Sequence, residues 1–153
     1  MTQTLTTSPR ALRLDTYWPY QIVVLADIIS RRTAAIVKDQ ADLNLSQWRV
    51  LAAIAEKPGR TAVEVVQMTP MDKGIVSRAT KALLEAGLVR REASQADGRV
   101  SHLFLTGPGQ ALYSRLLPPV EEISSEARKL LGDDTEIAFS ETLQELKDRF
   151  DLA

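Results

Sequence analysis

The chain has 153 residues but contains no cysteine and a single histidine, His102. The absence of cysteine excludes thiol catalysis, thiol redox sensing and zinc sites with cysteine ligands. One histidine cannot supply a histidine-based metal site, and we expect His102 to be a strand surface residue. We therefore expect no metal and no cofactor.

Long hydrophobic segments are absent as well. No apolar run approaches the about 20 residues that a membrane-spanning helix needs. Residues 1–9 are rich in Thr and Ser and contain no apolar signal core. These absences predict a soluble cytoplasmic protein that does not bind a membrane.

An enzyme would have to rely on carboxylate or lysine chemistry. The best carboxylate cluster is Glu121, Glu122 and Glu126, and the sequence around it holds no histidine, metal ligand or glycine-rich phosphate loop. This pattern is typical of a solvated helix face. We therefore expect that the protein is not an enzyme.

Charge is balanced overall but distributed unevenly. The chain carries 19 Lys and Arg against 20 Asp and Glu, a net charge of -1. Residues 1–43 have a net charge of +1, residues 44–106 of +3 and residues 107–153 of -5. The length fits about one domain, and its basic middle and acidic end indicate that different segments face different partners.

The N-terminal part predicts a flexible arm followed by a long helix. Residues 1–14 are polar, lack periodicity and contain Pro9. From Asp15 to about Asp39, apolar residues recur at steps of three, four and seven, as in an amphipathic helix. These residues are Ile22, Leu25, Ile29 and Ile36.

The C-terminal part predicts two further helices. The first is capped by Thr106 and contains Pro118 and Pro119, which should kink it or split it in two. The second opens at Asp133-Asp134. The apolar positions of the first are Leu112, Leu116, Val120, Ile123, Ala127 and Leu130, and those of the second are Phe139, Leu143, Leu146 and Phe150.

Between these parts, three short helices are expected. Ser46 is placed as the N-cap of the first, which ends at 57–59, and Thr61 forms a capping box with Glu64 at the start of the second. Thr69 is the expected cap of the third helix, with Pro70 in its first turn. This helix runs to Ala86, with Gly87 as a C-cap.

Two β-rich runs follow, at 88–92 and 100–105, separated by a polar stretch that contains Asp97-Gly98. Three helices followed by a hairpin is the order of a winged helix-turn-helix. In that fold the second helix of the pair enters the DNA major groove and the hairpin reaches the minor groove. The predicted fold class is mainly α with a small β-hairpin wing.

The third short helix has two distinct faces at about 100° per residue. Its apolar side consists of Ile75, Ala79, Ala82, Leu83 and Ala86. Its polar side consists of Lys73, Ser77, Thr80 and Lys81, with Gly74 and Arg78 at the edge. These polar groups suit base edges and phosphates, although a solvated surface helix is the alternative explanation. Leu84 also falls on the polar side and has no functional explanation.

The expected wing is basic. Arg90, Arg91 and Arg99 are predicted to gather around its polar tip. Asp97 lies two residues before Arg99, a spacing that lets a carboxylate orient a guanidinium on the same loop. An arginine on a narrow tip suits the negative potential of a narrow minor groove.

The region 45–112 resembles the MarR family of bacterial transcriptional regulators. The resemblance is carried by Leu-Ser-Gln-Trp-Arg-Val-Leu from residue 45, Met-Asp-Lys-Gly-Ile-Val-Ser-Arg-Ala from 71, Leu-Leu-Glu-Ala-Gly-Leu-Val-Arg-Arg from 83, Asp-Gly-Arg from 97 and Leu-Thr-Gly-Pro-Gly-Gln-Ala-Leu from 105. It implies a homodimer, a pseudo-palindromic operator and a repressor released by a small ligand.

On this resemblance the chain divides into an arm (1–14), an N-terminal dimerisation helix (15–43), a winged helix-turn-helix (44–106) and C-terminal dimerisation helices (107–153). Lys73, Ser77, Arg78 and Lys81 match recognition-helix positions, and Asp97 with Arg99 matches the wing pair. Two residues depart from the family pattern. Gly98 stands where a bulky basic residue is common, and Pro108 replaces a charged residue, which should loosen the next helix's first turn.

The long apolar stripes predict an obligate dimer, since they exceed what a small winged-helix core can cover. Packing within one chain is the alternative. Aromatic side chains with one cation also suit an aromatic or phenolic acid as effector, although core packing explains the aromatics too. The candidates are Tyr17, Trp18, Tyr20, Trp48 and Arg49.

The predicted function is a sequence-specific regulator that binds a double-stranded DNA operator as a homodimer, with a ligand-responsive repressor as the expected mode. Two alternatives remain open. One is a winged-helix module acting through protein contacts, and the other is a DNA-binding activator without an effector. Salt dependence distinguishes the first alternative, because phosphate contacts weaken steeply as salt rises.

Overall fold

The computed structural model describes residues 10–152, which form six helices and one two-stranded antiparallel hairpin. The elements are α1 (Trp18–Ala41), α2 (Leu45–Glu56), α3 (Ala62–Met68), α4 (Lys73–Glu85), β1 (Val89–Ala93), β2 (Ser101–Leu105), α5 (Gly107–Leu131) and α6 (Asp133–Asp151). This order confirms the predicted fold class. The arm falls mostly on residues 1–9, outside the described residues.

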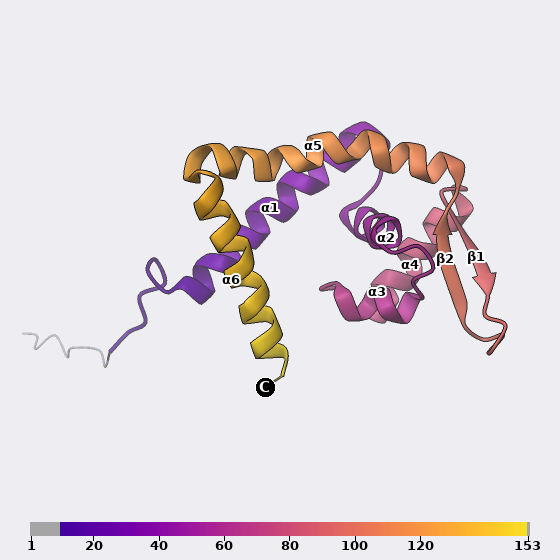
Figure 1. Cartoon of the computed structure of the whole chain (residues 1–153), viewed down its shortest axis with the longest axis horizontal. Coiled ribbons are helices and arrows are strands. Elements are labelled where there is room, and N and C mark those ends of the chain that lie inside the picture. The colour runs from indigo at the N-terminus through magenta and orange to yellow at the C-terminus, as the bar shows by residue number, and fades with distance from the viewer. Residues whose placement is uncertain (1–9, 153) are drawn as a thin grey trace, which may run out of the picture.

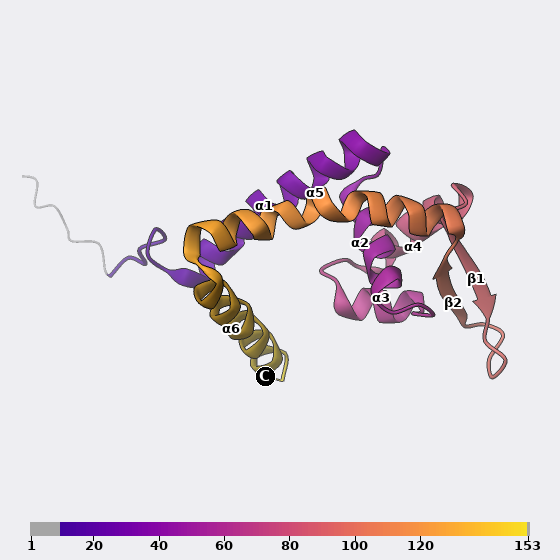
Figure 2. The ribbon, with the colours of Figure 1, turned by 45° about the horizontal axis from the view of Figure 1, so that its top comes forward.

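The elements form two regions, which we call the winged-helix lobe (α2 to β2) and the frame (α1, α5 and α6). Figure 1 shows α1 and α5 crossing the molecule, with the lobe at one end and α6 turned back at the other. The tilted view in Figure 2 shows the same separation. Among residues 10–152, no helix combines the length and apolar character needed to cross a bilayer.

The hydrophobic core lies mainly in the lobe. Leu51 and Ile54 of α2, Val65 of α3, and Val76 and Leu83 of α4 are almost completely buried. Each such side chain contributes about 1.5–3 kcal/mol relative to exposure. In contrast, α6 buries no residue at all within its described length.

Two helix starts differ from the sequence prediction. Asn44 caps α2 instead of Ser46: its Oδ1 accepts from the Gln47 N–H at 2.8 Å, and Gln47 Oε1 accepts from the Asn44 N–H at 2.9 Å. Asn44 is favoured over Ser46 because its capping box with Gln47 satisfies two backbone donors. Likewise Asp72 caps α4 through the Ile75 N–H at 2.8 Å, whereas Thr69 ends α3.

Three other predicted termini are confirmed. Thr61 caps α3 by accepting from the Glu64 N–H at 3.2 Å. Gly87 follows α4 with a φ of 71°, a left-handed conformation that favours glycine. Thr106 caps α5 by accepting from the Gly109 N–H at 3.1 Å. Pro108 does not loosen this turn, because first-turn N–H groups have no partner within the helix.

Of the two predicted effects of Pro118 and Pro119, a kink or a split of the helix, the split does not occur. α5 continues through both as one helix from Gly107 to Leu131. Flanking turns hold the helix together, since Leu116 is fully buried just before the prolines and Val120 packs against the core just after them.

His102 joins the hairpin to the loop after α2 rather than lying on the surface. Its Nδ1 lies 2.8 Å from the Gly59 carbonyl oxygen, and its side chain is half-buried. The neighbouring Leu103 accepts from the Gly59 N–H at 2.8 Å and donates to Arg60 O at 2.9 Å. The segment 59–61 thus pairs with β2 and fixes the wing to the lobe, with an isolated antiparallel bridge between Thr61 and His102. The sequence pattern did not reveal this contact between distant residues.

Candidate DNA interface

The outward face of α4 carries the predicted recognition residues. Its inner face packs on the core through Val76, Ala79 and Leu83. The exposed residues on the other side are Lys73, Gly74, Ser77, Arg78 and Lys81. The Asp72 cap fixes where this face begins, so Lys73 and Gly74 lie in the first turn, where recognition helices contact base edges.

Thr80 does not belong to this face. Its side chain is buried, with 7% of the residue exposed, and its hydroxyl has no hydrogen-bond partner among the described residues. Because α4 packs against both α2 and α3, its buried face is wide enough to cover this border position. Leu84 is also partly buried against the core, which accounts for its presence without a role in binding.

Gly74 leaves room for the Arg78 side chain one turn along the helix. A Cβ at Gly74 would lie 3.3 Å from Arg78 Nη1 and 3.4 Å from Asp72 Oδ1. The guanidinium therefore lies over the bare backbone of the first turn. A Cβ at position 74 would require the guanidinium to shift by a few tenths of an ångström.

The cations of α4 differ in their partners. Lys81 Nζ lies 3.9 Å from Glu85 Oε1. Glu85 belongs to the same exposed face, and the sequence prediction did not include it. Its i,i+4 spacing from Lys81 was the available signal. Lys73 and Arg78 have no acidic partner within 4 Å in the described part of the chain. They are thus the cations on this helix most available to an anionic ligand.

The wing tip has the predicted Asp97–Arg99 arrangement. Asp97 Oδ1 accepts from the Arg99 backbone N–H at 3.0 Å and lies 3.4 Å from Arg99 Nε. The Arg99 side chain is 93% exposed. One carboxylate thus holds both the turn and the base of an arginine that projects into solvent.

Arg90 and Arg91 are not gathered at this tip, contrary to the prediction. They are neighbours on β1, so their side chains alternate between the two faces of the hairpin. The Arg90 guanidinium lies 4.6 Å from the centre of the Phe104 ring and 3.2 Å from Glu92 Oε1. Arg91 is exposed. Only Arg99 occupies the tip.

The predicted effector residues do not form one pocket within a single chain. Trp48 is buried and stacks on Tyr113, with ring centres 5.7 Å apart, and Arg49 Nη2 lies 3.2 Å from Ser30 Oγ. Tyr17, the N-cap of α1, and Tyr20 are at the opposite end of α1, where Trp18 stacks on Phe150 of α6. The 24 residues of α1 span about 36 Å, which is why these aromatics are separated.

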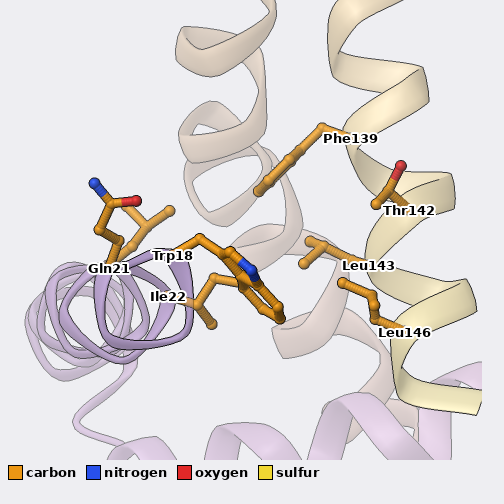
Figure 3. Close-up of a pocket in the computed structure, with 8 residues that line it drawn as sticks. Trp18, Gln21, Ile22, Phe139, Thr142, Leu143 and Leu146 are labelled. Carbon is orange, nitrogen blue, oxygen red and sulfur yellow. The ribbon is translucent and has the colours of Figure 1, made fainter. Parts of the chain in front are cut away.

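A groove of about 560 Å³ lies between α1 and α6 instead (Figure 3). Its lining is apolar apart from Gln21 and Thr142. Figure 3 shows Trp18 and Ile22 of α1 facing Phe139, Leu143 and Leu146 of α6. Trp18 also stacks on Phe150, with ring centres 6.5 Å apart.

Known proteins match this architecture. Residues 41–100 match the model of the MarR family. The transcriptional regulator HosA of Escherichia coli O111:H- is 28% identical over 114 residues, covering 74% of this chain and 84% of HosA. A MarR-family regulator from Silicibacter pomeroyi has a crystal structure with a TM-score of 0.79 and 26% identity, covering 90% of this chain and 94% of that one. These matches confirm the resemblance to the MarR family that the sequence predicts.

The function that these matches support is that of a DNA-binding transcriptional regulator, and the matched relatives and fold are those of regulators rather than enzymes. BpsR of Bordetella bronchiseptica has a TM-score of 0.67 and 25% identity, covering 83% of this chain and 98% of BpsR. The BpsR structure concerns regulation of its DNA binding by 6-hydroxynicotinic acid.

Proposed function

We propose that this MarR-family regulator binds a pseudo-palindromic operator as a homodimer and represses transcription until a small aromatic acid releases it. The observation that carries the proposal is the outward face of α4, where Lys73, Ser77 and Arg78 are exposed on a helix whose other side is anchored in the core. One such helix per protomer enters the major groove, and Arg99 of the wing enters the adjacent minor groove.

Exposed apolar surface on the frame supports the homodimer. On α1 alone, seven large apolar residues are at least 39% exposed: Trp18, Tyr20, Val23, Val24, Leu25, Ile28 and Ile29. A contiguous apolar surface of this kind marks an interaction site, and a second copy buries it by two-fold symmetry. Light scattering at micromolar concentration tests this step: a dimer mass is expected, and a monomer mass contradicts it.

Binding-site selection from a random duplex library tests the DNA interface. We expect a two-fold symmetric site, because a dimer presents two identical α4 helices. Arg99→Ala should lower affinity for that site about tenfold, the loss of one charged contact at the wing. Lys81→Ala should weaken binding to all sequences equally, as expected for a phosphate contact. Unchanged affinity of Arg99→Ala would contradict the role of the wing.

Salt dependence separates DNA binding from a protein-binding winged helix. Phosphate contacts release counterions, so the logarithm of the association constant should fall linearly as the logarithm of salt concentration rises. The slope should become shallower by about one on removal of one phosphate-binding lysine. A flat dependence would favour the protein-binding alternative.

Arg49 supports release by an aromatic acid. Its half-buried guanidinium bonds to the neutral Ser30 hydroxyl and has no acidic partner within 4 Å among residues 10–152. A planar carboxylate that enters between α1 and α2 would find this cation. The regulation of BpsR by 6-hydroxynicotinic acid is consistent with this class of ligand.

The test is operator release by a panel of hydroxylated aromatic acids. At least one acid should lower operator affinity of the wild type, and Arg49→Ala should bind the operator but resist release. Arg31→Ala serves as the control, because Arg31 is exposed on α1 and pairs with Asp27. Equal release of Arg49→Ala and wild type would contradict the assignment.

A further inference from the structure

The start of α5 is clamped to the end of the recognition helix. Thr106 Oγ1 donates to the Gly87 carbonyl at 2.6 Å, and the Thr106 N–H donates to the Leu88 carbonyl at 3.1 Å. Gly109 approaches so closely that a Cβ there would lie 1.9 Å from Leu88 O. The first turn of α5 and the end of α4 therefore move as one body.

The rest of the N-terminal half of α5 is fixed to the same lobe. Tyr113 stacks on Trp48 of α2, and Leu116 is completely buried. Leu116 is the last buried residue of α5, since none between 117 and 131 falls in the buried class. Residues 107–116 thus belong mechanically to the lobe.

Beyond Val120, which still packs partly against the core, α5 contacts α1. Both carboxylate oxygens of Glu126 accept from Arg32 Nη2 at 2.8 Å, and this is an ion pair between two frame helices. The lobe half and the frame half of α5 meet at Pro118 and Pro119. Neither proline carries a backbone N–H, so the carbonyls of Ser114 and Arg115 lose their helical donors there.

The chain also passes from the frame to the lobe at the end of α1, and this second connection lies beside the two prolines. Arg115 Nη2 donates to Gln40 O at 3.3 Å, which places this part of α5 next to the last turn of α1. α1 ends at Asp42, the one non-glycine residue with positive φ (53°) in the described chain. Lys38 hydrogen-bonds to Asp42 and lowers its pKa below the ordinary value. At the prolines α5 stays helical but lacks two backbone hydrogen bonds, and the adjacent end of α1 leaves the helical conformation at Asp42.

We propose that Pro118 and Pro119, together with the turn at Asp42, form an articulation that determines which half-site spacings the dimer accepts. The inference rests on the proposed DNA-binding dimer. Rotation of each lobe about the two prolines and the turn at Asp42 changes the separation of the two α4 helices. This separation must match half-sites about 34 Å apart. Two missing helical hydrogen bonds lower the cost of that swing.

The test measures affinity for the selected operator and for versions with half-site separation changed by one and two base pairs. Wild type is expected to tolerate a one-base-pair change. Pro118→Ala/Pro119→Ala restores both helical donors, and its affinity should fall about tenfold more than that of wild type on the same change, equivalent to about 1.4 kcal/mol. Affinity at the best spacing should be similar, since no DNA-facing residue is altered.

Glu121→Ala/Glu122→Ala is the matched control, because both residues are exposed in the next turn of α5 and neither change adds a backbone donor. Its spacing profile should match that of wild type. Superimposable profiles for wild type and the proline variant would overturn the articulation. Profiles that change for both double variants would overturn it as well.

Hydrogen exchange of the free protein gives a second, DNA-independent measurement. Amides of residues 120–123 should exchange faster in wild type than in Pro118→Ala/Pro119→Ala, and equal rates would overturn the proposal. If none of the proteins binds DNA, the proposed function fails, and the exchange rates still decide whether the prolines weaken the helix.

Discussion

The lobe and the frame differ in where they place their apolar residues. Between residues 45 and 105, the large apolar side chains in the exposed class are Val63, Met68 and Val100, whereas the three frame helices expose twelve. The lobe has its own core and exposes charge. The frame has little core of its own and exposes apolar surface. The difference indicates that the lobe folds on its own contacts, and it is the reason for proposing that a second copy covers the frame.

The largest effect is expected from charges on the frame. Val24→Asp/Ile28→Asp places carboxylates on exposed apolar positions of α1, where a dimer would bury them without partners. The dimer dissociation constant should rise at least about 100-fold, because an unpaired buried charge costs about 3–5 kcal/mol. Sedimentation equilibrium measures the change. Val63→Asp, on the exposed surface of α3, should leave the dimer intact. Equal effects of both changes on the dimer dissociation constant would contradict the difference between the frame and the lobe.

A core substitution in the lobe should act on folding instead. Leu51 is completely buried in α2, and Leu51→Ala should lower the free energy of unfolding by about 2–5 kcal/mol through lost burial and a cavity. Urea unfolding followed by circular dichroism measures this loss. Val63→Ala is the control, with an expected change below about 0.5 kcal/mol. A small effect of Leu51→Ala would show that the lobe does not depend on its own core.

Gly74→Ala should separate stability from binding within one helix. Alanine stabilises an exposed helix position by about 0.5–1 kcal/mol relative to glycine, so the melting temperature should rise. The new Cβ would displace the Arg78 guanidinium, so operator affinity should fall. Thermal unfolding and a binding titration measure the two effects. A rise or no change in affinity would exclude the proposed arrangement of Arg78.

The smallest effect is expected at Thr80. Its buried hydroxyl lacks a hydrogen-bond partner among the described residues, so Thr80→Val should stabilise the lobe by about 1 kcal/mol. Operator affinity should stay unchanged because the side chain faces inward. A clear loss of operator affinity with no gain in stability would show that Thr80 belongs to the DNA-contacting face.

Periodicity predicted the elements well because the apolar residues of each helix recur at helical spacing. The spacing of Leu112 and Leu116, for example, already defines α5. Caps were less predictable, since Asn44 and Ser46 are both good cap residues and only the reciprocal bond from Gln47 decides between them. Local sequence likewise does not say how far α2 and α3 wrap around α4, which is why the burial of Thr80 was missed.

In the candidate site, too, a contact between residues close in sequence was predictable, and the placement of distant residues was not. Asp97 and Arg99 are close in sequence, and their contact was predictable from spacing alone. Whether Tyr17 and Trp48 are brought together depends on the direction that α2 takes relative to α1 after the turn at Asp42. No periodic pattern contains that direction.

Selection of binding sites from a random duplex library is the most direct test of whether two copies of the protein bind DNA through α4 and the wing. We expect a two-fold symmetric site whose affinity falls in Arg78→Ala and Arg99→Ala, with half-sites one helical turn or a multiple of it apart. Recovery of an asymmetric site, or binding that both variants leave unchanged, would contradict it.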